Sequence, residues 1–247
     1  MKFFTLSFFI LIKSSFASTT LSCTHPCLCH MANKLLTPGQ NIIILPPRGI
    51  PDDLHHFDPN ISLIKKWLRS DHLLLAPKEL IDLPSLKKHK ASLSFTLPNN
   101  SSAAEAHFWL SSKMNCLYQK KLQGYLQSAG FKTQKIKCLD HEVLPSLKGK
   151  LFILTHDALS AKLSQAGAKV HSLKGSHHHS EIHAGDLKKI YQSLKEKKQA
   201  IWIIEKGHHI PHTLKSLQEK GKSYSLNGQD CELYKKLPKL FTKWSAL

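Results

Sequence analysis

The sequence predicts an α/β protein of two lobes, each a mostly parallel sheet flanked by helices, joined by one linking helix. Short apolar runs alternate with helical patterns in both halves of the chain, and a longer helical stretch separates the two series. The chain has 247 residues, of which 41% are hydrophobic and 21% charged. That is typical of a soluble globular protein with enough residues for one large domain or two small lobes.

In the first half, a strand, a helix and a second strand follow one another. Ile42 to Leu45 is a β-branched run closed by two prolines, which indicates a buried strand. Asn60 is a suitable N-cap for a helix with four apolar residues on one face: Ile61, Ile64, Trp67 and Leu68. Leu73 to Leu75 follows as another buried strand.

The second half repeats this alternation more clearly. The expected strands are Leu151 to Leu154, Val170 to Leu173, Ala200 to Ile204 and Tyr224 to Leu226. The expected helices are Asp157 to Ala166, ended by Gly167, one carrying Leu187, Ile190, Tyr191 and Leu194, and one carrying Leu214 and Leu217, ended by Gly221. Such alternation favours a parallel sheet covered on both faces.

Four segments are expected along the chain. Residues 1–17 have the layout of a secretory signal peptide, with Lys2, an apolar run, and Ser15 and Ala17 at the −3 and −1 positions of a cleavage site. The apolar run is too short to cross a bilayer of about 30 Å, and the alternative is a buried apolar N-terminus. Residues 18–112 are expected to form an N-terminal lobe, 113–128 the linking helix, and 129–247 a C-terminal lobe.

Export would place the six cysteines in an oxidising compartment, where one or more disulfides can form; the sequence alone does not decide whether they are paired. The alternative is that Cys27 and Cys29 bind metal together with His25 and His30, although the usual spacing of structural zinc sites is absent. The formal net charge of +18 attracts anionic partners. The lysines are spread along the chain without a long basic tract, so we expect no binding to nucleic acid.

Seventeen histidines are many for this length, and imidazole is a common ligand of zinc in proteins. Two have informative positions: His55 lies in a loop after the strand at Ile42 to Leu45, and His156 at the end of the strand at Leu151 to Leu154. Ligands of open α/β sheets lie beyond the carboxyl ends of the strands. Two facing lobes would therefore bring both imidazoles to one cleft. For each, the alternative is a structural histidine.

Three segments, in order along the chain, carry a resemblance to a known family. They are His55-His56-Phe57-Asp58-Pro59, Ala106-His107-Phe108-Trp109-Leu110-Ser111, and the apolar run from Phe152 that ends in His156-Asp157-Ala158. They resemble the His-x-aromatic-acid-Pro, His-x-Trp-Leu-Ser and His-Asp-Ala signatures of the metal-binding ABC-transporter substrate-binding proteins, in the zinc/manganese (ZnuA- and TroA-like) cluster. The similarity covers most of the mature chain.

The resemblance implies that His55, His107 and His156 bind the metal. It implies an extracytoplasmic (periplasmic) binding protein, not an enzyme, which works as a monomer and delivers its cargo to the membrane permease of an ABC importer. The implied cargo is Zn2+, because three neutral imidazoles suit zinc, with Mn2+ or another divalent transition metal as the alternative.

The chain departs from the family where a fourth ligand is often found, an aspartate just after the strand near the C-terminus. Asn227 stands there, so water, Asp230 or Glu205 would have to take the position. The run from His177 to His183 is interpreted either as a weak metal-gathering loop or as a solvated polar loop. A further group is interpreted as plain surface: His208, His209 and His212.

Two other classes of function stay open as alternatives. A zinc site of three histidines with an open position would suit a zinc-dependent hydrolase, but the sequence shows no nucleophile, and no general base other than Glu205 stands out. The other class is a secreted basic protein that binds nucleic acid or an acidic surface. Salt-dependent binding that is insensitive to chelators would favour this second class.

Overall fold

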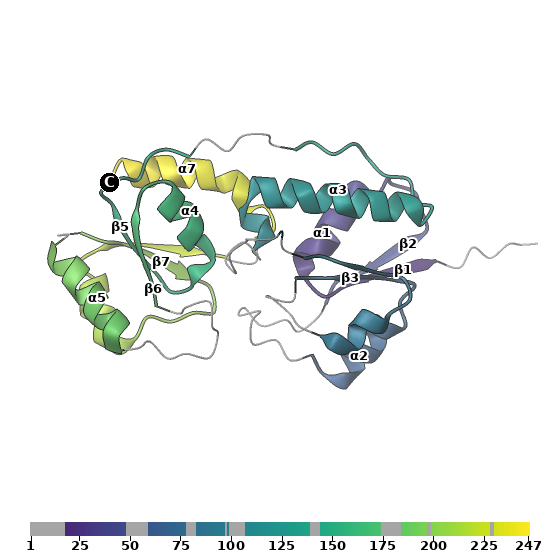
Figure 1. Cartoon of the computed structure of the whole chain (residues 1–247), viewed down its shortest axis with the longest axis horizontal. Coiled ribbons are helices and arrows are strands. Elements are labelled where there is room, and N and C mark those ends of the chain that lie inside the picture. Colours follow the sequence, from purple (N-terminus) through teal and green to yellow (C-terminus); the bar gives the residue numbers. More distant parts are fainter. Residues whose placement is uncertain are drawn as a thin grey trace, which may run out of the picture.

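Two parallel sheets of four strands form two lobes that lie side by side in the computed structural model (Figure 1). The structure describes residues 18–47, 59–77, 83–96, 98, 107–138, 144–173, 184–196, 199–227 and 230–247. The predicted fold class, two parallel sheets flanked by helices, is confirmed. The signal peptide proposed for residues 1–17 lies outside the described part, and no described helix is long and apolar enough to cross a membrane.

The first sheet has the order β2-β1-β3-β4, with every neighbouring pair parallel. Its strands are β1 (Thr19–Cys23), β2 (Ile42–Leu45), β3 (His72–Leu75) and β4 (Ser92–Ser94). The second sheet has the order β6-β5-β7-β8, also parallel throughout. Its strands are β5 (Leu151–Leu154), β6 (Lys169–Ser172), β7 (Ile201–Glu205) and β8 (Lys222–Leu226). All carboxyl ends of a sheet therefore meet at one edge.

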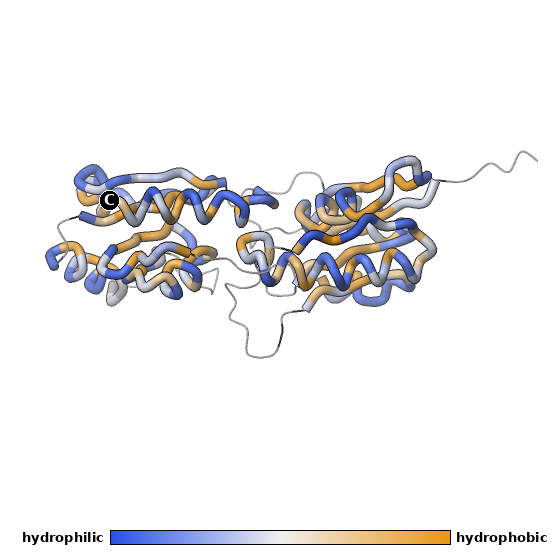
Figure 2. Tube along the Cα trace, turned by 90° about the horizontal axis from the view of Figure 1, so that it is seen from above, coloured by the Kyte–Doolittle hydropathy of each residue, from blue (hydrophilic) through white to orange (hydrophobic). Residues whose placement is uncertain are grey.

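Helices cover both faces of each sheet. Along each helix, hydrophilic and hydrophobic residues alternate, as the colours of Figure 2 show. The first lobe holds α1 (Pro26–Leu35), α2 (Ile61–Leu68), the 3₁₀ helices η2 (Pro84–Lys88) and η4 (Phe108–Leu110), and α3 (Ser112–Ser128). The second holds η5 (Asp157–Leu159), α4 (Ser160–Gln165), α5 (Ala184–Glu196), α6 (His212–Gln218) and α7 (Leu233–Ser245). The predicted cap of α2 is confirmed, since the Asn60 Oδ1 accepts a hydrogen bond from the Leu63 N–H at 2.9 Å.

Strand β5 shows how the alternation of side chains builds two cores in the second lobe. Leu151 and Ile153 point to one face of the sheet, where they pack with residues of β7, α5 and α6: Trp202, Ile190 and Leu214. Phe152 and Leu154 point to the other face, against residues of α4 and α7: Leu163, Leu237, Phe241 and Trp244. All four strand residues are buried, which explains why β5 is a continuous apolar run.

The lobes are tied to one another covalently. Cys27 in α1 forms a disulfide with Cys231, which lies just before α7. Lys34 of α1 forms an ion pair with Glu232 beside this bridge. One cluster of buried apolar side chains also includes members from both lobes, such as Leu21, Leu74, Phe152 and Trp244. Figure 1 shows α3 above the first lobe and α7 above the second, meeting end to end at this junction.

Two further disulfides, Cys23–Cys29 and Cys116–Cys138, complete the pairing of all six cysteines. The structure thus decides the pairing that the sequence left open. The alternative in which Cys27 and Cys29 bind metal with His25 and His30 is wrong, because a sulfur in a disulfide offers no thiolate to a metal.

Candidate metal centre

Three elements bring histidines to the junction of the two lobes. His156 directly follows Thr155 at the carboxyl end of β5, and His208 follows the carboxyl end of β7. These strands are neighbours in the sheet, so the two loops start next to each other. His107 comes from the other side, as the N-cap residue of η4, which packs against α7.

The rings of His107 and His208 both contact the ring of His156. The ring centroid of His156 is 5.0 Å from that of His107, with the rings nearly perpendicular at 74°. It is 4.9 Å from that of His208, with the rings stacked at 17°. All three residues are buried, with exposed fractions of 5%, 5% and 6% for His107, His156 and His208.

A carboxylate fixes the central histidine. The Glu205 Oε2 lies 3.0 Å from the His156 Nδ1, and His156, Glu205 and His208 offer donor atoms that all lie within 4.8 Å of one another. When Nδ1 donates its proton to this carboxylate, the tautomer and the orientation of the ring are fixed and the lone pair is on Nε2. Glu205 is itself held because its N–H donates to the Thr155 Oγ1 at 2.9 Å.

A second carboxylate stands on the opposite side of the same ring. The Asp157 Oδ1 lies 3.6 Å from the His156 Nε2. Burial raises the pKa of Asp157, an effect that the nearby His156 opposes and Glu205 reinforces. The centre thus combines neutral nitrogen donors with carboxylates whose charges are largely removed from water, a composition that favours a divalent cation.

Behind the centre lies an aromatic layer built on His25. This residue caps α1, where its Nδ1 accepts a hydrogen bond from the Cys27 N–H at 3.0 Å. Its ring stacks on Trp109 with centroids 4.4 Å apart, and Trp109 in turn contacts His107 edge to face at 5.3 Å. Complete burial, with a smaller contribution from His107, lowers the pKa of His25 to about 3. His25 is therefore neutral and acts as a structural support.

The structure describes some of the predicted site residues and not others. His107 and His156 lie together, whereas His55 and the segment from His177 to His183 are outside the described residues. Asn227 directly follows β8, and its carbonyl accepts a hydrogen bond from the Asp230 N–H at 3.0 Å. The ligand set of the sequence analysis therefore stays a prediction.

The interpretation of His208 as plain surface is wrong, because it is buried and stacked on His156. The signal that would have found it is the one used for His156, its position just beyond the carboxyl end of a predicted strand. His209 and His212 are exposed, in agreement with that interpretation.

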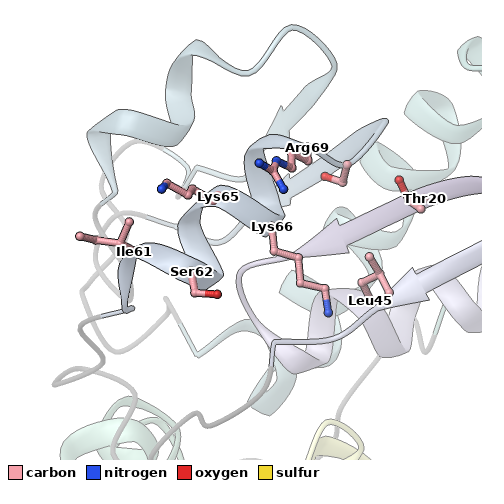
Figure 3. A pocket seen from close by; sticks show the side chains of 8 residues that line it. Thr20, Leu45, Ile61, Ser62, Lys65, Lys66 and Arg69 are labelled. Carbon is pink, nitrogen blue, oxygen red and sulfur yellow. The ribbon is translucent and has the colours of Figure 1, made fainter.

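A separate feature of the first lobe is a hollow of about 600 Å³ beside α2, away from the histidines (Figure 3). Its lining includes Lys65, Lys66 and Arg69 of α2 and its C-cap, together with Thr20 and Leu45 of the neighbouring strands. Figure 3 shows Lys66 extending from α2 toward Leu45. Among the described residues, none of these three cations forms an ion pair with a carboxylate.

The sequence matches no protein-family profile and no curated protein. Its structure, in contrast, matches a crystal structure of ZnuA with a TM-score of 0.63 at 13% identity, over 93% of this chain and 99% of that one. FpvC of Pseudomonas aeruginosa, a substrate-binding protein in complex with Mn2+, matches with a TM-score of 0.63 at 15% identity, over 92% and 99%. The fold is that of the metal-binding substrate-binding proteins.

Zn(II)-bound AdcA of Streptococcus pneumoniae gives a TM-score of 0.59 at 15% identity, over 94% of this chain. The chain spans only 58% of AdcA, but it covers 100% of the ZnuA-like domain of that protein, at 16% identity and a TM-score of 0.58. The resemblance that the three sequence segments carry is thus confirmed at the level of the fold.

Proposed function

We propose that this protein captures a divalent transition metal, zinc in the first place, outside the cytoplasm and delivers it to the permease of an ABC importer. The observation that supports this most directly is the buried cluster in which the rings of His107 and His208 both contact His156, whose Nδ1 lies 3.0 Å from the Glu205 carboxylate. Its position at the junction of two lobes, in a fold whose solved relatives include Zn(II)- and Mn2+-bound proteins, supports the same function. His55 belongs to the proposed ligand set through the resemblance alone.

The nature of the donors favours zinc over manganese. Imidazole nitrogen suits zinc, copper and nickel, whereas manganese prefers carboxylate and other oxygen ligands. Here the carboxylate of Glu205 is engaged with the His156 Nδ1 at 3.0 Å. In that role it orients a ligand instead of acting as the general base of a hydrolase, so we propose a binding protein and not an enzyme.

Three disulfides support a location outside the cytoplasm, because such bonds persist in oxidising compartments and are rare in reducing ones. We propose the periplasm or the outer cell surface, reached through the signal peptide expected at residues 1–17. The partner would be a membrane permease that recognises the protein as a monomer.

The decisive experiment is calorimetric titration of the tag-free, metal-stripped mature protein with zinc, beside the His107→Ala and His156→Ala variants. We expect one tight site in the wild type and its loss in both variants, because each substitution removes a direct ligand. His209→Ala is the matched control, since His209 is exposed near the same loop. Weak, multiple sites that survive both substitutions would contradict the proposed function.

The cationic hollow beside α2 favours a second candidate, binding to an acidic surface. Lys65, Lys66 and Arg69 are exposed and without carboxylate partners among the described residues. Such binding should weaken steeply with salt and should not respond to chelators. Alanine substitution of all three should lower the salt concentration that elutes the protein from heparin more than alanine substitution of three other exposed lysines: Lys215, Lys220 and Lys222. If both triple variants lower the eluting salt concentration equally, the binding depends only on the total charge of the protein and not on this hollow.

A further inference from the structure

The sheet order decides which loops of the second lobe reach the centre. In the order β6-β5-β7-β8, β5 and β7 are neighbours and β8 lies at the edge. The loop after β5 supplies His156, so the loop best placed to meet it is the one after β7, which carries His208. The residue after β8, Asn227, is one strand further away.

The candidates after β8 are also poorly suited as ligands. Asn227 offers a neutral amide, a poor ligand for zinc, which prefers imidazole, thiolate and carboxylate. The carboxylate of Asp230 is engaged elsewhere: its Oδ1 accepts a hydrogen bond from the Glu232 N–H at 3.0 Å, and its Oδ2 contacts the Lys236 Nζ. Both interactions hold Asp230 at the start of α7.

A tight turn sets the position of His208. The His208 N–H donates to the Glu205 carbonyl at 3.0 Å, which closes a turn of four residues. Gly207 within it has a φ of 87°, a conformation that glycine adopts at little cost and other residues rarely adopt. The turn therefore places His208 at a defined distance from Glu205, whose side chain holds His156.

From this arrangement we infer that His208 is the fourth metal ligand and sets the metal preference of the site. The inference rests on the proposed function. In it, His208 takes the ligand position that the family resemblance would assign to the residue at Asn227. His208 is buried, it stacks on His156 at 4.9 Å, and its donor atom lies within 4.8 Å of those of His156 and Glu205.

An imidazole in the fourth position changes the chemistry of the site. It replaces an anionic oxygen donor by a neutral nitrogen donor, which favours zinc, cobalt and nickel and disfavours manganese. With four neutral ligands, the positive charge of the ion is balanced by carboxylates that contact a ligand and do not bind the metal. Glu205 is such a carboxylate, because it contacts His156.

The test compares three variants of the full mature chain, stripped of metal: His208→Ala, His208→Asp and, as the matched control, His209→Ala. Zinc and manganese affinities are measured by competition with chelators, and the ligand set by the electronic absorption of the cobalt(II) form. Loss of a residue that only orients a ligand costs about 10- to 100-fold in affinity, so His208→Ala should cost zinc binding at least about 100-fold. His208→Asp should shift the ratio of zinc to manganese affinity toward manganese, and its cobalt spectrum should differ from that of the wild type.

Two results would overturn the inference. If His208→Ala binds zinc as tightly as His209→Ala while His107→Ala and His156→Ala abolish binding, His208 is not a ligand and the proposed function stands. If the cobalt spectrum and the zinc-to-manganese ratio of His208→Asp equal those of the wild type, His208 acts only in packing. Retained tight binding in His107→Ala, His156→Ala, His208→Ala and His208→Asp alike would instead contradict the proposed function itself. Urea unfolding of the metal-free variants verifies that each one folds.

Discussion

Protonation of His25 should make the metal-free protein markedly less stable in mild acid. This histidine is completely buried, and its pKa is lowered from 6.5 to about 3. In the unfolded chain the same ring titrates near 6.5. Because the folded-state pKa is the lower one, the unfolded state binds more protons between these two values. The stabilising effect of the neutral ring is complete above pH 6.5 and is lost as the pH falls toward 3.

The size of this effect follows from the shift. Stability falls by about 1.4 kcal/mol for each pH unit within the window. Between pH 7.5 and pH 4.5, His25 alone should therefore lower the free energy of unfolding by about 2 to 3 kcal/mol. That is a large share of the total stability of about 5–15 kcal/mol that is usual for a folded protein.

Urea unfolding at both pH values, in the presence of EDTA, measures this loss. All four tryptophans are buried, so their fluorescence reports unfolding directly. The key variant is His25→Asn, because asparagine is also a good N-cap but does not titrate. The variant should be less stable at pH 7.5, where the stack on Trp109 is lost, but it should lose about 2 to 3 kcal/mol less than the wild type on acidification. Exposed His209→Asn is the control. An equal loss in wild type and His25→Asn would refute the reasoning.

Two other predictions concern the centre and the junction. Glu205→Gln keeps the shape of the side chain but removes the charge that orients His156, so zinc affinity, measured by competition with a chelator, should fall about 10- to 100-fold; an unchanged affinity would contradict the orienting role. The disulfides differ in the chain they enclose, with sequence separations of 204 for Cys27–Cys231 and 22 for Cys116–Cys138. Replacement of the first pair by serine should cost about 5 kcal/mol and of the second about 3 kcal/mol in urea unfolding without reductant, and equal losses would argue against loop entropy as the cause.

Sequence patterns identified most elements of the fold but missed β1, α1, β4 and α7, and for β1 and α7 the reason is physical. The central strand β1 (Thr19–Cys23) was not predicted, because Thr19 and Thr20 give it a polar start and it adjoins the stretch interpreted as a cleavage site. Helix α7 has buried residues at helical spacing, Leu237, Phe241 and Trp244, but Pro238 inside it interrupts the pattern that marks a helix interior. Both elements are specified by tertiary packing more than by local preference.

In the candidate site too, some residues could be predicted from sequence and one could not. His107 and His156 could be proposed from sequence because each lies in a motif, and the position of His156 after an apolar strand has a physical meaning of its own. His208 was missed since the neighbouring exposed His209 and His212 make the segment look like a polar surface. Its burial depends on the pairing of β5 with β7, a contact between residues about fifty positions apart in sequence, such as Ile153 with Trp202. No local pattern contains that information.

The way the lobes are joined bears on how a metal would be captured. His107 belongs to η4, which packs against α7 of the second lobe, whereas His156 follows β5. His25 supports His107 through Trp109 and lies two residues from Cys27, the half-cystine that binds Cys231 of the second lobe. The donors on the two sides of the centre are thus braced by one covalent bond and one shared core. Folding itself, and not closure of hinged lobes, would set their separation, so selectivity must come chiefly from the chemistry of the donors.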